Sequence, residues 1–134
     1  MIGRLHERIL KAIEETVPLE FSVLDADGKV IAWNKHDTRI FKRPVTALGK
    51  NVRDCHPRES LVKVEQILAE MRKKRRDKAR FWIDLGKDDK KIKVLIEYYA
   101  LRDPNGVYLG CLEVTQDITE IQKLSGEKRL LNEV

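Results

Sequence analysis

The chain has 134 residues, of which 42% are hydrophobic and 37% are charged, and its net charge is +5. This length and this hydrophobic fraction predict a single domain with a core of its own. The high charged fraction favours a thermophilic source. Two cysteines far apart in the sequence exclude a disulfide framework, and no apolar run reaches membrane-spanning length, so we expect a cytoplasmic protein.

The N-terminal segment, 1–16, has apolar residues at three- and four-residue spacing, which predicts an amphipathic helix that ends before Pro18. The next segment, FSVLDADGKVIAWN, has two short β-rich runs on either side of Asp-Ala-Asp-Gly, which is typical of a β-hairpin. Residues 35–44 are expected to form one short helix, and Gly49 then marks a turn.

The most regular helical pattern covers residues 58–75, where one side is apolar and the others are charged. Its apolar stripe consists of Leu61, Val64, Leu68 and Met71. Three alternating segments follow, 79–86, 91–102 and 106–117, and we expect them to form three antiparallel strands. The last segment, 117–131, is predicted to be a helix. Its apolar residues are Ile121, Leu124 and Leu131.

This order of elements predicts an α+β fold, in which one five-stranded antiparallel sheet is covered on one face by the middle helices. We divide the chain into an N-terminal flanking helix, 1–16, a central domain, 17–121, and a C-terminal helix or tail, 122–134.

Several motifs, in this order, resemble those of PAS domains, the sensory modules of many signalling proteins. The first hairpin resembles the PAS hairpin that ends in an asparagine, here Asn34, and ALGKNV resembles the turn before the long helix. LRDPNGVYLGCLEVTQDITE resembles the final hairpin with its Asp-Ile-Thr motif, so the resemblance covers residues 17–121. RDCHP and the sequence after the last strand also resemble PAS domains that follow hemerythrin-like domains in archaea and anaerobic bacteria.

The resemblance implies a sensory or interaction module, not an enzyme, with a ligand or cofactor between the sheet and the helices. It implies that signals leave through Asp117 and Thr119, and that partners include an upstream metal-binding domain or a downstream output domain. The first helix cannot cover its own narrow apolar stripe and needs another surface to pack against, which predicts a homodimer through that helix. The charged segment between Asn34 and Gly49 departs from the family pattern and predicts a smaller or more polar pocket floor.

Cys55 and His56 directly precede Pro57 and the long helix, and two interpretations remain open. In haem-binding PAS domains a histidine near this helix holds the iron, so His56 is the candidate axial ligand if haem b is bound. Alternatively, Pro57 occupies the first helical position, and His56 or Asp54 caps the helix or a loop carbonyl. Cys55 is either a redox-active thiol or ordinary packing. No spacing of cysteines and histidines indicates zinc.

Strand alternation and the helical stripe together select the residues that we expect to line the cleft. Alternatively, the same residues form an ordinary core that leaves no space for a ligand. The candidate pocket residues are Trp33, Phe41, Val52, Cys55, His56, Leu61, Val64, Leu68, Phe81, Ile83, Ile96, Tyr98 and Leu112.

Two other functions are considered. A ligand-free interaction module is favoured if the core contains no cavity. The segment 72–80 carries seven basic residues and one acid, which suits nucleic-acid binding, but a basic run without interleaved aromatic residues is more typical of a solvated helix end. No catalytic motif or phosphate-binding loop is present, so we expect no enzyme activity.

Overall fold

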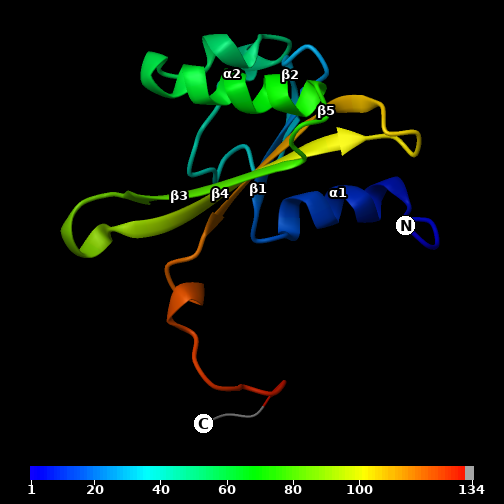
Figure 1. Cartoon of the computed structure of the whole chain (residues 1–134). Helices are drawn as coiled ribbons and strands as arrows, with labels where there is room; N and C mark the ends of the chain where they lie inside the picture. Colours follow the sequence, from blue (N-terminus) through cyan, green and yellow to red (C-terminus); the bar gives the residue numbers. More distant parts are fainter. Residues whose placement is uncertain (132–134) are drawn as a thin grey trace.

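The protein, seen here in a computed structural model that describes residues 1–131, forms one five-stranded antiparallel sheet and two α-helices (Figure 1). The strands lie in the order β2-β1-β5-β4-β3. The predicted α+β fold with a five-stranded antiparallel sheet is confirmed. The strands are β1 Glu20–Asp25, β2 Val30–Trp33, β3 Lys78–Leu85, β4 Ile92–Arg102 and β5 Tyr108–Asp117, and the helices are α1 Glu7–Thr16 and α2 Arg58–Arg72.

The first hairpin, β1–β2, is closed by the side chain of Asp25. Its Oδ1 accepts hydrogen bonds from the amides of Asp27 and Lys29, each at 2.9 Å, while Gly28 adopts a φ of +83° that suits a residue without Cβ. β1 also pairs with β5 along its whole length. The first strand and the last strand therefore lie together at the centre of the sheet.

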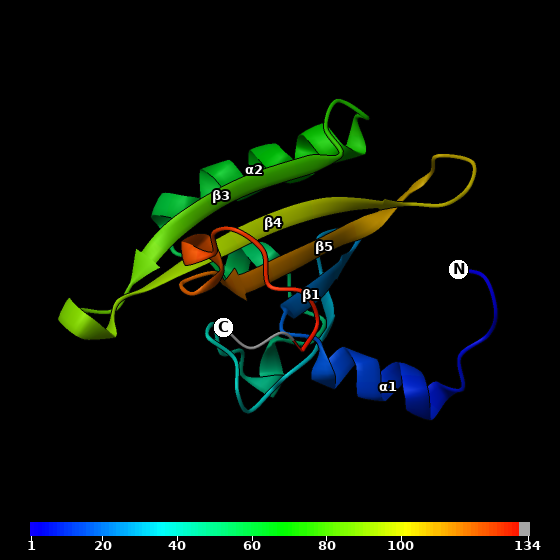
Figure 2. The same cartoon turned by 90° about the horizontal axis from the view of Figure 1, so that it is seen from below.

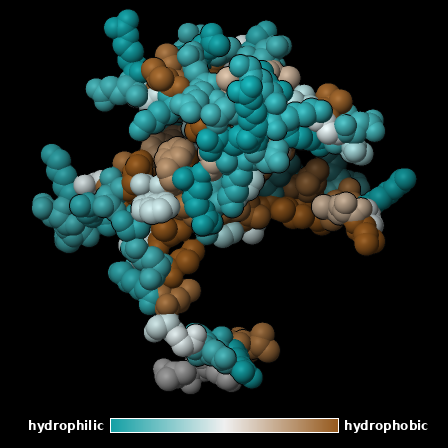
Figure 3. All heavy atoms as spheres, viewed as in Figure 1, coloured by the Kyte–Doolittle hydropathy of each residue, from teal (hydrophilic) through white to brown (hydrophobic). Residues whose placement is uncertain are grey.

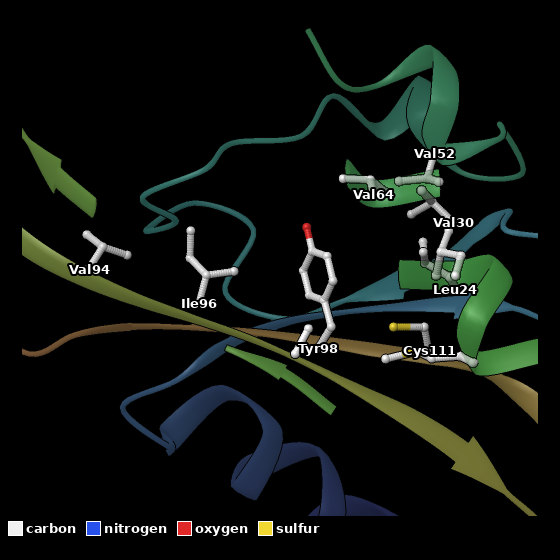
Figure 4. Packing of buried hydrophobic residues seen from close by; sticks show 11 residues of the cluster. Leu24, Val30, Val52, Val64, Val94, Ile96, Tyr98 and Cys111 are labelled. Atoms are coloured by element: carbon white, nitrogen blue, oxygen red, sulfur yellow. The ribbon is translucent and has the colours of Figure 1, made fainter. Parts of the chain in front are cut away.

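The core lies between α2 and the sheet face that α2 covers. Alternate residues of β4, Val94, Ile96 and Tyr98, point to this face, and Val64 stands opposite them on α2 (Figure 4). Side chains at every second position of a strand share one face, and side chains spaced three or four positions apart share one side of a helix. The two sets therefore meet in one layer between β4 and α2. In Figure 1, α2 lies on one side of the sheet and α1 on the other.

α1 is attached mainly through its C-terminal end. Nδ2 of Asn34 donates to the carbonyl oxygen of Glu14 at 2.6 Å, and the amide of Lys35 donates to Glu15 Oε2 at 2.9 Å. The helix has no buried residue. It begins at Glu7 because the imidazole of His6 caps it, with Nδ1 accepting from an amide of the first turn. Residues 1–5 are not helical, which corrects the expected start.

The expected helix over residues 35–44 is wrong, because buried charged side chains hold this segment as a loop. The carboxylate of Glu20 accepts hydrogen bonds from the amides of Ile40 and Phe41 at 2.7 and 3.0 Å. The guanidinium of Arg39 donates to the carbonyl oxygens of Asn34 and Phe41 at 3.0 and 2.9 Å. These backbone amides and carbonyl oxygens already have side-chain hydrogen-bond partners, so forming the hydrogen bonds of a helix would add little stability.

The expected helix over residues 117–131 is also wrong within the described part of the chain. Only one 3₁₀ turn, Ile121–Lys123, forms there. Leu124 and Leu131 are 79% and 93% exposed, so the apolar stripe packs against no surface formed by residues 1–131, and a short helix without packing is marginal. The expected tail, 122–134, reaches residues 132–134, which lie outside the described residues. α2 ends at Arg72, short of the expected residue 75.

Candidate functional site

A cavity of about 1200 Å³ opens between the sheet, the start of α2 and the loop that precedes it. Strand β3 and strand β4 form one wall, the first turns of α2 form the opposite wall, and the segment 39–47 closes one end. Glu20 and Arg39 hold the loop in place where it borders this space.

The walls of the cavity are largely apolar. Phe81 and Tyr98 meet edge to face, with ring centroids 5.6 Å apart, and Ile96 lies beside them on β4. Val64 and Ile67 of α2 face them. Figure 4 shows the hydroxyl of Tyr98 directed away from the sheet, and burial raises the pKa of this phenol. These residues form a site suited to a flat apolar body.

The floor of the cavity is polar and is built from two arginines. Oγ of Ser22 accepts from Nη2 of Arg39 and from Nε of Arg43, each at 3.1 Å. Nη2 of Arg43 donates to Oε2 of Glu113 at 3.0 Å, and this ion pair is mostly buried. The charged segment between Asn34 and Gly49 thus supplies polar groups to the floor, as expected, although the cavity is not small.

Glu113 is the carboxylate of this floor that lines the cavity from β5, and only 8% of its surface is exposed. Burial raises its pKa, while the charges of Arg43 and Arg39 act in the opposite direction. Among residues 1–131, its Oε1 is buried without a hydrogen-bond partner. A buried polar atom without a partner calls for a physical explanation, and an absent ligand is one such explanation.

His56 lies at the entrance to α2 and lines the cavity. Its Nε2 is buried and has no partner in the described chain. Burial, and secondarily the charge of Arg43, lowers the pKa of the imidazole, so the ring is held neutral. The capping interpretation is wrong, because Pro57 is the N-cap residue of α2 and no side chain among the described residues caps this helix. Cys55 is exposed, and it forms no disulfide with the buried Cys111.

The buried His56 predicts a pH dependence of stability. The unfolded chain takes up a proton at the ordinary pKa of about 6.5, whereas the folded chain does so only at lower pH. Stability contributed by the neutral ring is therefore lost as the pH falls below about 6.5. Urea unfolding should show a larger loss between about pH 7.5 and about pH 5.5 in the unchanged protein than in His56→Gln. Equal losses in the two proteins would contradict this role.

Eight of the thirteen residues expected to line the cleft do line the cavity. They are Phe41, Cys55, His56, Val64, Phe81, Ile83, Ile96 and Tyr98. The structure places the other five elsewhere. Val52 and Leu68 are buried in the core, and Leu112 points to the opposite face of β5. Leu61 does not line the cavity, and Trp33 donates from Nε1 to Nδ1 of His36 at 3.1 Å, outside it.

Sequence reasoning missed the charged and hydroxyl residues of the floor, because such residues are usually assigned to the surface. One signal was available. Alternation along β5 places Glu113 and Thr115 on the same face as the apolar Cys111. A carboxylate on the inner face of a central strand is unusual, and it indicates either an ion pair or a site.

The expected signalling residues, Asp117 and Thr119, close the end of β5 onto the start of β4. Oγ1 of Thr119 accepts from the amide of Lys93 at 2.9 Å, and Oδ1 of Asp117 accepts from the amide of Thr119 at the same distance. The amide of Ile118 donates to the carbonyl oxygen of Lys93, also at 2.9 Å. The junction is therefore fixed to β4, the strand that carries Ile96 and Tyr98 into the cavity.

Two features are absent from the described part of the chain. No three histidine, cysteine, aspartate or glutamate side chains of residues 1–131 come together in a way that could hold a metal ion. Within the same residues, no helix combines the length and the apolar character needed to cross a membrane.

Comparison with known proteins gives consistent matches in family and fold. A family profile described as a PAS domain matches residues 10–119. The crystal structure of a C-terminal domain from Streptococcus mutans is 30% identical, covers 93% of this chain and 94% of its own, and superposes with a TM-score of 0.82. A PAS domain from Colwellia psychrerythraea is 20% identical over 84% of this chain and 97% of its own, with a TM-score of 0.61. The PAS domain of BvgS from Bordetella pertussis is 17% identical over 87% and 88%, with a TM-score of 0.62. Curated proteins gave no match.

Proposed function

The chain belongs to the PAS-domain family of sensory modules, and from this premise we propose that it binds a small molecule in the cavity between the sheet and α2. The observation that carries the proposal is the construction of the cavity. Apolar walls enclose a polar floor in which a buried carboxylate oxygen, Glu113 Oε1, has no partner within the described chain. This combination is typical of ligand pockets and untypical of a core that only needs to be filled.

The route by which an occupied cavity would act on a neighbouring domain follows β4 and β5. Glu113 and Thr115 line the cavity from β5, and the same strand ends in Asp117. On β4, Ile96 lies in the cavity wall and Lys93 binds Thr119. A ligand that shifts either strand would therefore also shift the junction at Asp117 and Thr119, which supports their role as signalling residues.

Filling the cavity tests the proposal. Ile96→Trp places an indole in the cavity, and we expect it to abolish a non-protein mass that the unchanged protein retains in native mass spectrometry. Leu95→Trp is the matched control, because residue 95 is the next position on β4 and points to the opposite face of the sheet. Retention of the same mass by Ile96→Trp would contradict the proposal. A protein that retains no molecule at all would favour the ligand-free interaction module.

We also propose that α1 mediates a homodimer. Its apolar residues Ile9, Leu10 and Ile13 remain 53%, 44% and 41% exposed. Figure 3 shows apolar atoms gathered below the sheet, where α1 lies. In Figure 2 this helix projects away from the rest of the domain, which leaves its sides open to a second copy. An exposed apolar stripe of this kind marks an association surface.

Light scattering at micromolar concentration should then give about 31 kDa, twice the 15.6 kDa of one chain. The double substitution Ile9→Glu and Ile13→Glu should reduce the mass to that of a monomer, because charged residues would have to be buried in the interface. Lys11→Glu, on the same helix but outside the apolar stripe, should leave the dimer intact. A monomeric unchanged protein would rule out this interface.

Haem b held by His56 is a second candidate for the cavity. The neutral imidazole and its unpartnered Nε2 suit an axial ligand chemically. The enclosure of Nε2 does not suit it, because a flat macrocycle cannot approach a fully buried nitrogen unless the ring moves. We therefore expect hemin titration to give no shift of the Soret band that depends on His56. A shift that is lost in His56→Ala would establish haem as the ligand.

Binding of nucleic acid through segment 72–80 is a weaker alternative. Several of its basic side chains already have partners in the chain. Nε of Arg72 donates to the carbonyl oxygen of Ala26 at 3.1 Å, and Lys78 and Arg80 pair with Glu97 at 3.4 and 3.2 Å. Fewer basic side chains therefore remain to bind phosphates.

We propose instead that the domain acts in cytoplasmic signalling, next to an upstream metal-binding domain, such as a hemerythrin-like domain, or a downstream output domain.

A further inference from the structure

The floor of the cavity indicates what kind of ligand it accepts. We propose that the ligand is a small, planar, uncharged molecule that presents an amide-like edge, an N–H beside a C=O, to Glu113 and Arg43. This inference rests on the proposed function, and it adds the chemical class of the ligand to it.

Glu113 supplies the group that pairs with the ligand N–H. Its carboxylate uses Oε2 for Arg43, and Oε1 has no partner among residues 1–131. The residue lies on the cavity-facing side of β5, and only 8% of it is exposed. Because Oε1 is itself fully buried, a ligand reaches it only if the carboxylate rotates toward the cavity that this side chain lines. A buried acceptor that gains a donor recovers the free energy lost by its desolvation.

Arg43 supplies the group that pairs with the ligand C=O. Its guanidinium donates from Nε to Ser22 and from Nη2 to Glu113. In the described chain no hydrogen bond uses Nη1, although the side chain lines the cavity. A guanidinium presents its donors in a fixed planar fork, and one hydrogen bond joins it to Glu113, so the unused donor Nη1 and the unused acceptor Oε1 belong to the same ion pair. An amide edge has the complementary order of acceptor and donor.

Charge excludes the ionic ligands of similar shape. Arg43 pairs with Glu113 in the floor, and Arg39 pairs with Glu20 just behind it, so the buried charges are two cations and two carboxylates. A ligand carboxylate would stand against Glu113, and a ligand cation would stand against Arg43. Either would also lose its hydration on entering a mostly apolar cavity. An uncharged ligand avoids both costs.

The apolar walls define the rest of the molecule. Phe81 and Tyr98 form one side and Val64 and Ile67 the other, so a ring inserted between the sheet and α2 contacts both layers. The polar edge of such a ring then points to β5, where Glu113 lies. A planar aromatic or heterocyclic amide meets both requirements.

Four probes with one ring and one variable group test the inference. Benzamide, benzoate, benzamidinium and acetophenone are titrated into the full chain, and backbone amide shifts of Ile96, Tyr98 and Glu113 report binding. We expect benzamide to bind at least about tenfold more tightly than any of the other three, as one hydrogen bond to a buried charged group would give. Tightest binding by benzoate or benzamidinium would overturn the inference of an uncharged ligand.

A double variant assigns the preference to the pair. Arg43→Met with Glu113→Leu replaces the buried pair by apolar side chains of similar size, and we expect benzamide to lose its advantage over acetophenone. The matched control is Arg53→Met with Glu65→Leu, an exposed pair outside the cavity, which should keep the advantage. An advantage that survives the cavity substitution would overturn the inference. If that variant does not fold, the probe series on the unchanged protein decides alone.

The outcomes separate this inference from the proposed function. Cavity shifts with another order of affinities overturn the ligand class and leave the sensory cavity standing. No cavity shift with any probe overturns the ligand class, and the retained mass in the Ile96→Trp experiment then decides the proposed function independently.

Discussion

Replacement of Arg39 by methionine is expected to lower the free energy of unfolding by about 3 to 5 kcal/mol. Arg39 is 6% exposed, and its guanidinium donates to the carbonyl oxygens of Phe21, Asn34 and Phe41. Burial lowers its pKa, and the carboxylate of Glu20, 4.0 Å away, counteracts this effect. Methionine would leave that carboxylate buried without its counter-charge and the carbonyl oxygens without donors. Urea unfolding at neutral pH measures the loss.

Arg53→Met is the matched control for this substitution. Arg53 pairs with Glu65 at 2.9 Å, but the two side chains are 59% and 41% exposed. Exposed ion pairs contribute roughly 0 to 1 kcal/mol, so the control should lose less than about 1 kcal/mol. If Arg39→Met were no more harmful than Arg53→Met, the buried charges would not hold the loop that borders the cavity.

Gly110→Ala is expected to destabilise the protein by about 3 kcal/mol or more, although it adds a single methyl group. Gly110 lies on β5 opposite Asp25 of β1, with a φ of +155°. A Cβ there would overlap the carbonyl oxygen of Leu24 and lie 3.2 Å from Cα of Asp25. The obstacle is backbone at the centre of the sheet, which cannot move without separating β1 from β5. Thermal unfolding should show a correspondingly lower midpoint.

Gly49→Ala separates overlap from backbone strain. Gly49 also has a positive φ, +79°, but a Cβ at this position would have no atom within 4 Å. Only the cost of a left-handed conformation remains, about 1 kcal/mol. A similar loss in both variants would show that strain, and not contact between β1 and β5, limits residue 110.

The parts of the fold that follow from local sequence were predictable. The hairpin turn at Asp25 contains its own hydrogen-bonding side chain, and a second aspartate, Asp103, closes the β4–β5 turn by accepting from the amides of Asn105 and Val107. The stripe that begins at Leu61 predicted α2 because its period needs no distant partner. Each of these signals lies within a few residues of the structure that it determines.

The loop over residues 35–44 was not predictable in the same way. Its conformation depends on Glu20, which lies 20 positions before Ile40 in the sequence and binds the amide of that residue. The sequence pattern around residues 35–44 does not indicate a contact with a residue so far away in the chain. The helix predicted over residues 117–131 was wrong for the opposite reason. Its apolar stripe, which includes Leu124, has no packing partner within the described chain. Tertiary contacts, present in one case and absent in the other, overrode local propensity.

The candidate site likewise has a part that local sequence predicts, the walls, and a part that depends on distant contacts, the floor. The walls could be read from the alternation that places Ile96 and Tyr98 on one face of β4. The floor could not, because Arg43 and Glu113 are 70 positions apart and each resembles an ordinary surface residue when viewed alone. Only their burial and their mutual hydrogen bond identify them as part of a site.

The most direct test of the central claim is electron density in the cavity of the protein as purified. A crystal structure should show a non-protein molecule between Tyr98 and Val64, with a polar edge within hydrogen-bonding distance of Glu113. A cavity closed by the side chains of its own walls, with Glu113 Oε1 bound to another protein group, would contradict the account.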